Sequence, residues 1–190
     1  MINFSEPYLS FRSKLNGCKA IFQENLVGNG LWTEKLKRQI SYEYNISINN
    51  IHITNSCTSA LEISLRICKI KYPNKKKVIL PSYTFSSSAN CLVLAGFEPI
   101  FCDVDKLTGS MRLDHILDVY NPEEVAGIIC VHYGGGLCDI ENIKDFCNAE
   151  NLFLVEDAAQ AYGLEFKNNF AGKFGDFGCF SFHSTKVLSA

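Results

Sequence analysis

The sequence lacks the signals that would place a protein in a membrane or send it across one. No apolar run approaches the roughly 20 residues that a membrane-spanning helix needs, and the N-terminus lacks the basic and apolar segments of a signal peptide. Charge is nearly balanced, with 18 lysines and arginines against 20 aspartates and glutamates. We interpret the basic run at residues 75–77 as an exposed loop, because no basic stripe accompanies it. We therefore expect a cytoplasmic protein with no membrane or nucleic-acid partner.

The nine cysteines lack a pattern that closes disulfides or binds metal. Their number is odd, no Cys-x-x-Cys occurs, and most of them lie in apolar or helical stretches. A free cysteine in such a place behaves as a small hydrophobic residue. The sequence therefore predicts reduced thiols, and neither a disulfide framework nor a zinc site.

Short apolar runs alternate with longer amphipathic segments along most of the chain. The runs at residues 128–131 and 152–155 are typical of strands buried on both faces of a parallel sheet. Similar runs predict strands at residues 78–80, 100–102 and 177–182. Strands that alternate with helices indicate right-handed β-α-β crossovers. The sequence therefore predicts an α/β fold with a mostly parallel sheet flanked by helices.

Five segments before and between these runs have helical patterns. Gly96 is a common helix terminator, and Asp139 can cap the start of a helix. The predicted helices are residues 33–44, 58–70, 84–95, 113–120 and 140–149. We expect residues 1–30 to form an irregular N-terminal arm and residues 31–190 to form one domain, because neither repeats nor a linker interrupt them.

Two charged residues in the last forty positions indicate the chemistry. Asp157 follows one predicted strand and Lys186 follows another. Pyridoxal phosphate (PLP) requires these two groups in an enzyme. A lysine amine forms a Schiff base with its aldehyde, and a carboxylate keeps its ring nitrogen protonated so that the ring accepts electrons. Each residue alone also has an ordinary explanation, as a helix cap for Asp157 and as a surface lysine for Lys186.

Hydroxyl side chains fall where the phosphate of the same cofactor would need them. Thr58 and Ser59 lie at the start of a predicted helix, where hydroxyls and free N–H groups bind anions. By itself this pattern is more often a helix cap than a ligand site. Ser181, which precedes the lysine, can add a further hydroxyl.

A flat cofactor also needs an apolar wall and a contact for its phenolic oxygen. Phe85 follows a strand end and can supply the wall, although a core aromatic is the ordinary interpretation. Gln160 can donate an amide N–H to the phenolic oxygen without cancelling the charge of Asp157.

Residues 134–136 are glycines but lack the spacing of a nucleotide-binding loop, so they predict a tight turn. In an open parallel sheet these strand ends would converge on one cleft.

The chain carries five blocks in a fixed order, from about residue 25 to its end. They are Ser-Cys-Thr-Ser-Ala-Leu (56–61), Pro-Ser-Tyr-Thr-Phe (81–85), Val-His-Tyr-Gly-Gly (131–135), Val-Glu-Asp-Ala-Ala-Gln (155–160) and Gly-Cys-Phe-Ser-Phe-His-Ser-Thr-Lys (178–186). Together they resemble the DegT/StrS group of PLP-dependent sugar-nucleotide aminotransferases. The resemblance implies an aspartate aminotransferase-like (type I) fold, with residues 31–190 as part of the large PLP-binding domain.

The roles that the resemblance implies agree with those argued from the chemistry. They are a covalent link through Lys186, pairing with the pyridine nitrogen by Asp157, contact with the phenolic oxygen by Gln160, phosphate binding by Thr58, Ser59 and Ser181, and cover of the ring by Phe85. No metal is implied.

The first two blocks are most similar to those of relatives that aminate dTDP-4-oxo-6-deoxy-D-glucose with glutamate as donor. The resemblance thus implies a ping-pong transamination and a homodimer, because active sites in the family form at the subunit interface. Relatives are about twice this length, so we expect the rest of the large domain and the C-terminal small domain to be missing. Val187 departs from the asparagine that many relatives have there.

Two other interpretations remain open. A sugar dehydratase of the same fold has a histidine in place of the lysine, so Lys186 favours the transaminase. The chain can instead be a truncated, non-catalytic fragment or a partner that only binds. In that case uncovered sheet edges and apolar helix faces predict poor solubility.

Overall fold

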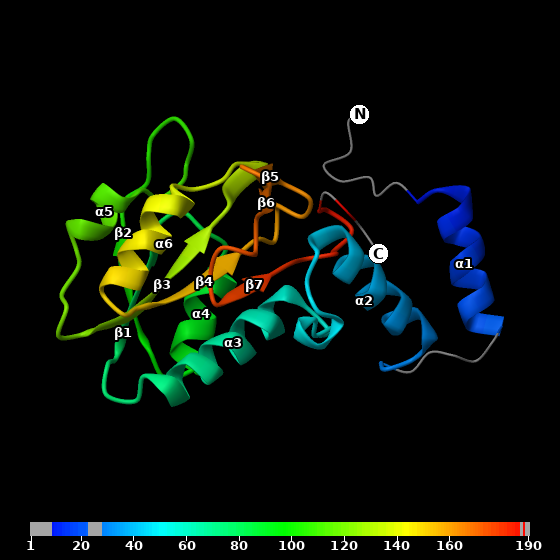
Figure 1. Ribbon diagram of the computed structural model, residues 1–190, viewed down its shortest axis with the longest axis horizontal. Coiled ribbons are helices and arrows are strands. Elements are labelled where there is room, and N and C mark those ends of the chain that lie inside the picture. Colours follow the sequence, from blue (N-terminus) through cyan, green and yellow to red (C-terminus); the bar gives the residue numbers. More distant parts are fainter. Residues whose placement is uncertain (1–8, 23–27, 187, 189–190) are drawn as a thin grey trace.

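A parallel sheet forms the centre of the protein. The computed structural model in Figure 1 describes residues 9–22, 28–186 and 188. Its five strands pair in the order β2-β1-β3-β4-β7, and every pair is parallel. They are β1 (Lys77–Pro81), β2 (Glu98–Cys102), β3 (Val125–Val131), β4 (Phe153–Asp157) and β7 (Phe177–Cys179). A separate antiparallel hairpin joins β5 (Glu165–Phe166) to β6 (Asn169–Phe170).

Helices cover both faces of this sheet (Figure 1). Helices α3 (Cys57–Lys71) and α4 (Ser86–Leu94) pack on one face, and α5 (Leu113–Leu117) and α6 (Ile140–Ala149) pack on the other. Side chains alternate along each strand, so Ile129 contacts the α3 side and Ile128 contacts the α6 side. All seven residues of β3 are buried, as its uninterrupted apolar sequence requires in a sheet covered twice.

Helix α2 (Leu31–Tyr44) joins the sheet through aromatic packing. Tyr44, which is 2 % exposed, lies with its ring centroid 4.8 Å from that of Phe170 and 5.4 Å from that of Phe180. The helix is capped at its C-terminal end by Asn45, which adopts the left-handed conformation (φ 47°) that asparagine tolerates. These contacts fix α2 against the segments that follow β4 and β7.

The predicted architecture is confirmed, with changes in the bounds of some elements. Helices α2, α3 and α6 lie where their patterns predicted them, and α6 has the predicted bounds. Helix α4 begins two residues later than predicted, at Ser86, and α5 ends at Leu117 instead of residue 120. The strand predicted over residues 177–182 ends at Cys179, and the hairpin of β5 and β6 was not predicted. Within the described residues no helix is long and apolar enough to cross a membrane.

The prediction of an irregular N-terminal arm is wrong for its middle part. Residues Phe11–Phe22 form helix α1, which has no buried residue and stands apart from the sheet in Figure 1. The sequence of α1 has apolar residues at helical spacing, but the glycine at its seventh position obscured the pattern. Residues 1–8 and 23–27 of the predicted arm lie outside the described residues, and the domain bounds stay a prediction.

Candidate active site

One large cavity lies at the carboxyl ends of the strands. Its volume is about 1480 Å³, and its wall includes the last residues of β3, β4 and β7, which are Val131, Asp157 and Cys179. Ligands of open parallel sheets bind at this edge because the strand ends and the following helix starts leave a crevice there. Six predicted site residues line this cavity, namely Thr58, Phe85, Asp157, Gln160, Ser181 and Lys186.

Asp157 is the buried acid of this cavity. Its side chain is 5 % exposed, and Ser88 Oγ on α4 donates to Oδ2 at 2.8 Å while Ala159 N–H donates to Oδ1 at 3.2 Å. Burial raises the pKa of Asp157, whereas these two hydrogen bonds and the charges of His132 and Lys186 oppose the rise. The carboxylate is thus fixed in place and keeps lone pairs free for a cationic partner in the cavity.

Ser88 is a site residue that the sequence did not reveal. It is fully buried, and Thr84 Oγ1 lies 3.0 Å from its hydroxyl oxygen. Ser88 is the third of three consecutive serines at the start of α4, so it looked like an ordinary first-turn residue. Only the folded structure, which brings the start of α4 to the end of β4, shows that this one serine faces Asp157.

Lys186 lies in the turn that follows β7. Its backbone N–H donates to His183 O at 2.9 Å, which closes the turn. Lys186 lines the same cavity as Asp157 and Cys57. His183 is exposed, and its Nδ1 lies 3.0 Å from Thr185 Oγ1. Val187 lies outside the described residues.

At the first turn of α3, one of the predicted phosphate-binding residues lines the cavity and another does not. Ser56 is the N-cap, and its Oγ accepts from Ser59 N–H at 3.1 Å. The Ser59 hydroxyl is turned back toward Ser56 Oγ at 3.1 Å and is not part of the cavity wall. Thr58 lines the cavity at the positive end of the helix dipole, and Ser181 lines it from the segment that follows β7. The structure therefore brings Thr58 and Ser181 to the cavity and leaves Ser59 beside the cap.

Phe85 and Gln160 occupy the wall in different ways. Phe85 is 72 % exposed at the N-terminal end of α4, so its ring is an uncovered apolar surface of the cavity and no core residue. Gln160 Oε1 accepts from Gly134 N–H at 2.9 Å, which leaves the amide NH₂ for a ligand. The glycine turn was predicted correctly, because Gly134 (φ 63°) and Gly135 (φ 80°) adopt left-handed conformations.

Glu156, the neighbour of Asp157, holds together the structure behind the cavity. It is fully buried and faces away from Asp157, on the α6 side of the sheet, because neighbouring strand residues alternate. Its carboxylate accepts from the backbone N–H groups of Gly172, Phe174 and Gly175 at 2.6–2.7 Å. His132 Nε2, also fully buried, lies 2.9 Å from Glu156 Oε2. One carboxylate thus joins β3, β4 and the loop before β7.

The loop that Glu156 holds needs glycine at residue 172. Gly172 has φ 85°, and a side chain there would collide with the Phe180 ring. No role was predicted for Glu156 from the sequence. A charged residue at the end of an otherwise apolar strand nevertheless indicates a buried carboxylate whose hydrogen bonds are satisfied.

The chain resembles solved structures of aminotransferases. The chain matches the aminotransferase TlmJ from Streptoalloteichus hindustanus with a TM-score of 0.89 and 28 % identity, over 100 % of this chain and 50 % of that one. It matches the PLP form of the putative sugar aminotransferase Spr1654 from Streptococcus pneumoniae with a TM-score of 0.78 and 25 % identity, over 99 % of this chain and 50 % of that one.

The sequence places the chain within one family of this class. Residues 13–190 match the DegT/DnrJ/EryC1/StrS aminotransferase family, to which the chain belongs. It is 30 % identical to the dTDP-4-dehydro-2,3,6-trideoxy-D-glucose 4-aminotransferase of Saccharopolyspora spinosa, over 99 % of this chain and 48 % of that protein. The chain thus spans about half the length of the relatives it matches. The predicted family and fold are confirmed.

Proposed function

We propose that the protein is a PLP-dependent transaminase that converts a 4-keto-6-deoxy sugar nucleotide to the 4-amino sugar. The observation that carries this proposal is the meeting of Asp157 and Lys186 in one cavity. They come from two different strand ends, and each was predicted from the needs of the same cofactor. The residues around them fit that cofactor in charge, shape and hydrogen bonding.

Each wall of the cavity offers what one part of PLP requires. Asp157 would pair with the ring nitrogen, because its hydrogen bonds from Ser88 and Ala159 leave room for one N–H donor. Thr58 and Ser181 would hold the phosphate at the start of α3, with Ser59 N–H already bound to the cap.

The remaining wall residues fit the ring of the cofactor. Phe85 would cover the ring, and the Gln160 amide NH₂ would contact its phenolic oxygen. Gln160 is held for this contact by the hydrogen bond from Gly134.

Lys186 is the group that would bind PLP covalently and move protons. PLP supplies the aldehyde that receives the amine and a ring that takes up electrons. The Lys186 amine would take the proton from the α-carbon of the amino donor. In the second half-reaction it would deliver a proton to the sugar carbon that receives the amine. Asp157 would stabilise the positive ring nitrogen throughout, because its carboxylate is fixed before the ligand arrives.

We propose dTDP-4-oxo-6-deoxy-D-glucose as the acceptor and glutamate as the donor, which makes the product dTDP-4-amino-4,6-dideoxygalactose. The blocks at residues 56–61 and 81–85 support this choice, and the Saccharopolyspora relative is named for a dTDP-linked 4-keto sugar. The cavity of about 1480 Å³ exceeds the roughly 300–1,000 Å³ of an ordinary ligand pocket, so it can admit a substrate beside the cofactor. We also propose a homodimer.

The two half-reactions test this function separately. Glutamate added to the PLP-loaded protein should remove the visible absorbance of the bound cofactor, and the dTDP-linked keto sugar should restore it. The corresponding GDP-linked keto sugar is the matched comparison for the nucleotide. If glutamate leaves the spectrum unchanged, the proposed donor is wrong. If the GDP sugar restores it as fast, the nucleotide assignment is wrong.

A pair of lysine variants tests the role of Lys186. Lys173 lines the same cavity, but its Nζ donates to Tyr44 O at 2.6 Å. Arginine keeps the charge and removes the primary amine, so Lys186→Arg should lose the visible band and turnover. Lys173→Arg should keep both. The opposite result would assign the cofactor to Lys173.

A further inference from the structure

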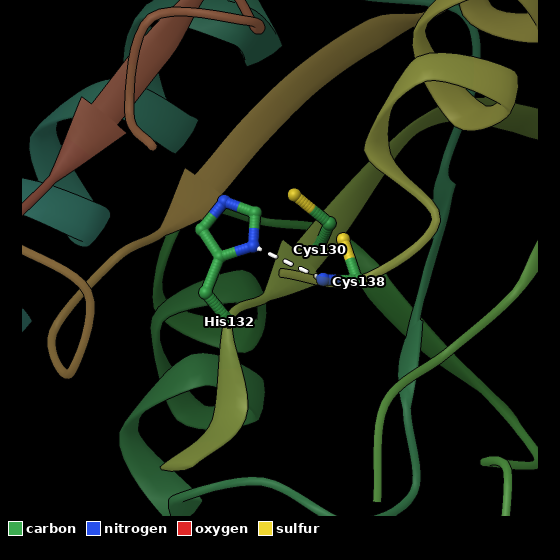
Figure 2. Close-up of side chains that lie close together, drawn as sticks. All are labelled: Cys130, His132 and Cys138. Carbon is green, nitrogen blue, oxygen red and sulfur yellow. Dashed lines mark hydrogen bonds between the residues drawn. The ribbon is translucent and has the colours of Figure 1, made fainter. Parts of the chain in front are cut away.

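Three buried side chains meet behind the cavity wall, between the end of β3 and the start of α6. Figure 2 shows Cys130, His132 and Cys138 pointing toward one another. Cys130 Sγ, one ring nitrogen of His132 and Cys138 Sγ all lie within 4.8 Å of one another. The exposed fractions of the three residues are 0 %, 0 % and 6 %. We call these residues the Cys₂His cluster.

The buried carboxylate of Glu156 orients the histidine of this cluster. His132 Nε2 lies 2.9 Å from Glu156 Oε2, and the carboxylate is itself fixed by three backbone N–H groups. The other nitrogen, Nδ1, therefore faces the two sulfur atoms (Figure 2). A carboxylate that binds one nitrogen while the other faces a ligand position is the usual second contact of metal-binding histidines.

The donor atoms suit a thiophilic metal ion. Zinc binds cysteine sulfur at about 2.3 Å and histidine nitrogen at about 2.0 Å, so its tetrahedral ligands lie roughly 3.3–3.8 Å apart. The atoms of the Cys₂His cluster need to approach by only about an ångström to reach this spacing. Two thiols with an imidazole select zinc over magnesium or calcium, which prefer oxygen ligands.

The present contact of His132 Nδ1 is weak. Nδ1 accepts a long hydrogen bond of 3.4 Å from Cys138 N–H, so its lone pair is directed toward the residue that carries one of the two thiols. A bound metal ion would replace this contact and would displace the thiol protons of Cys130 and Cys138.

We propose that the Cys₂His cluster binds one zinc ion through Cys130 Sγ, His132 Nδ1 and Cys138 Sγ. The spacing Cys-x-His-x₅-Cys did not indicate a zinc site, because only the turn between β3 and α6 brings Cys138 back to the strand. Three protein ligands leave one tetrahedral position for water or another ligand. His132 is also one of the residues that line the large cavity, so the cluster lies directly behind the cavity wall.

The bound ion would join the two ends of the turn at residues 133–137. That turn carries Tyr133, which lines the cavity, and Gly134, whose N–H holds Gln160. Zinc would therefore stabilise the wall of the cavity without touching the cofactor position. None of the three ligands has a role in the proposed transaminase reaction, so zinc binding can be measured separately from that activity.

Zinc content and thiol protection test the site on the unaltered protein. The chain is stripped with a chelator under reducing conditions, and Zn²⁺ is then titrated. We expect about one tightly bound zinc ion per chain, with release of protons. Zinc should also protect Cys130 and Cys138 from alkylation, as peptide mass mapping would show. Co²⁺ at the site should give a thiolate charge-transfer band. No bound zinc, or zinc that protects other cysteines instead, would overturn the proposal.

Matched cysteine variants separate this site from the other thiols. Cys130→Ala and Cys138→Ala should each weaken zinc binding about tenfold or more, since each removes a ligand. Cys68→Ala is the control, because Cys68 is equally buried but packs on the α3 side of the sheet. Equal loss in the control, or unchanged binding in both cluster variants, would contradict the assignment. The protection experiment stays decisive if a cluster variant fails to fold.

Discussion

The two acidic residues at the end of β4 are neighbours with opposite surroundings. Glu156 is fully buried on the α6 side, where three backbone N–H groups and His132 surround its carboxylate. Asp157 faces the cavity on the α3 side, and two hydrogen-bond donors hold it. The first carboxylate is completely paired within the fold, and the second is incompletely paired at a cavity. We infer that Glu156 serves stability and that Asp157 serves the ligand.

Glu156→Gln should give the largest effect on stability. The amide NH₂ would face backbone N–H groups or the His132 ring, so buried donors would lose their acceptor. We expect the free energy of unfolding to fall by about 3–5 kcal/mol, the usual result of breaking a buried charged network. Urea denaturation measures this change. Glu156→Gln with the stability of the unaltered chain would remove the structural role that we assign to this residue.

Asp157→Asn should lower turnover strongly and leave stability nearly unchanged. Because burial raises the pKa of Asp157, its ionisation in the folded state costs stability at neutral pH, and asparagine removes that cost. We expect stability that is unchanged or higher by about 1 kcal/mol. Turnover should fall about a hundredfold or more, because the charge opposite the ring nitrogen is lost. Parallel denaturation and transamination assays on the variant test both parts, and a large loss of stability with activity intact would contradict the comparison.

Ser88→Ala should weaken the support of Asp157 without removing the acid. The Ser88 hydroxyl stabilises the ionised carboxylate, so its loss should raise the pKa of Asp157 further. The acid limb of the pH profile of turnover should then move to higher pH. We expect a stability loss of about 1–2 kcal/mol from the lost hydrogen bond. Ser87→Ala, in the same turn of α4, is the control, and an identical shift in that variant would argue against a specific contact.

Glu141→Gln should have the smallest effect on the free energy of unfolding. Glu141 Oε2 pairs with Lys167 Nζ at 2.7 Å, but both side chains are largely exposed, at 43 % and 66 %. Solvent-exposed pairs contribute about 0–1 kcal/mol. Denaturation at low and high salt should show a difference within this range. A loss as large as that of Glu156→Gln would mean that carboxylate burial does not decide these effects.

The parts of the fold that the sequence predicted well are those decided by local pattern. The apolar runs of β3 and β4 and the amphipathic spacing of α6 follow from burial of the same residues that make the pattern. The convergence of Thr58, Asp157 and Lys186 was predictable because parallel strands end at one edge of the sheet.

The features that the sequence did not predict depend on contacts between distant segments. Ser88 faces Asp157 only because the fold brings the start of α4 to the end of β4, and Cys138 meets Cys130 only because a turn returns to the strand. Helix α1 and the β5–β6 hairpin are short or interrupted, so no strong periodicity marked them.

The most direct test of the cofactor assignment is peptide mass mapping after borohydride reduction of the protein with PLP. The reduced adduct should lie on Lys186, whose amine shares the cavity with Asp157. It should be absent in Lys186→Arg and retained in Lys173→Arg. An adduct on Lys173 or on a lysine outside the cavity, or no adduct on folded protein, would contradict the assignment of this cavity as a PLP site.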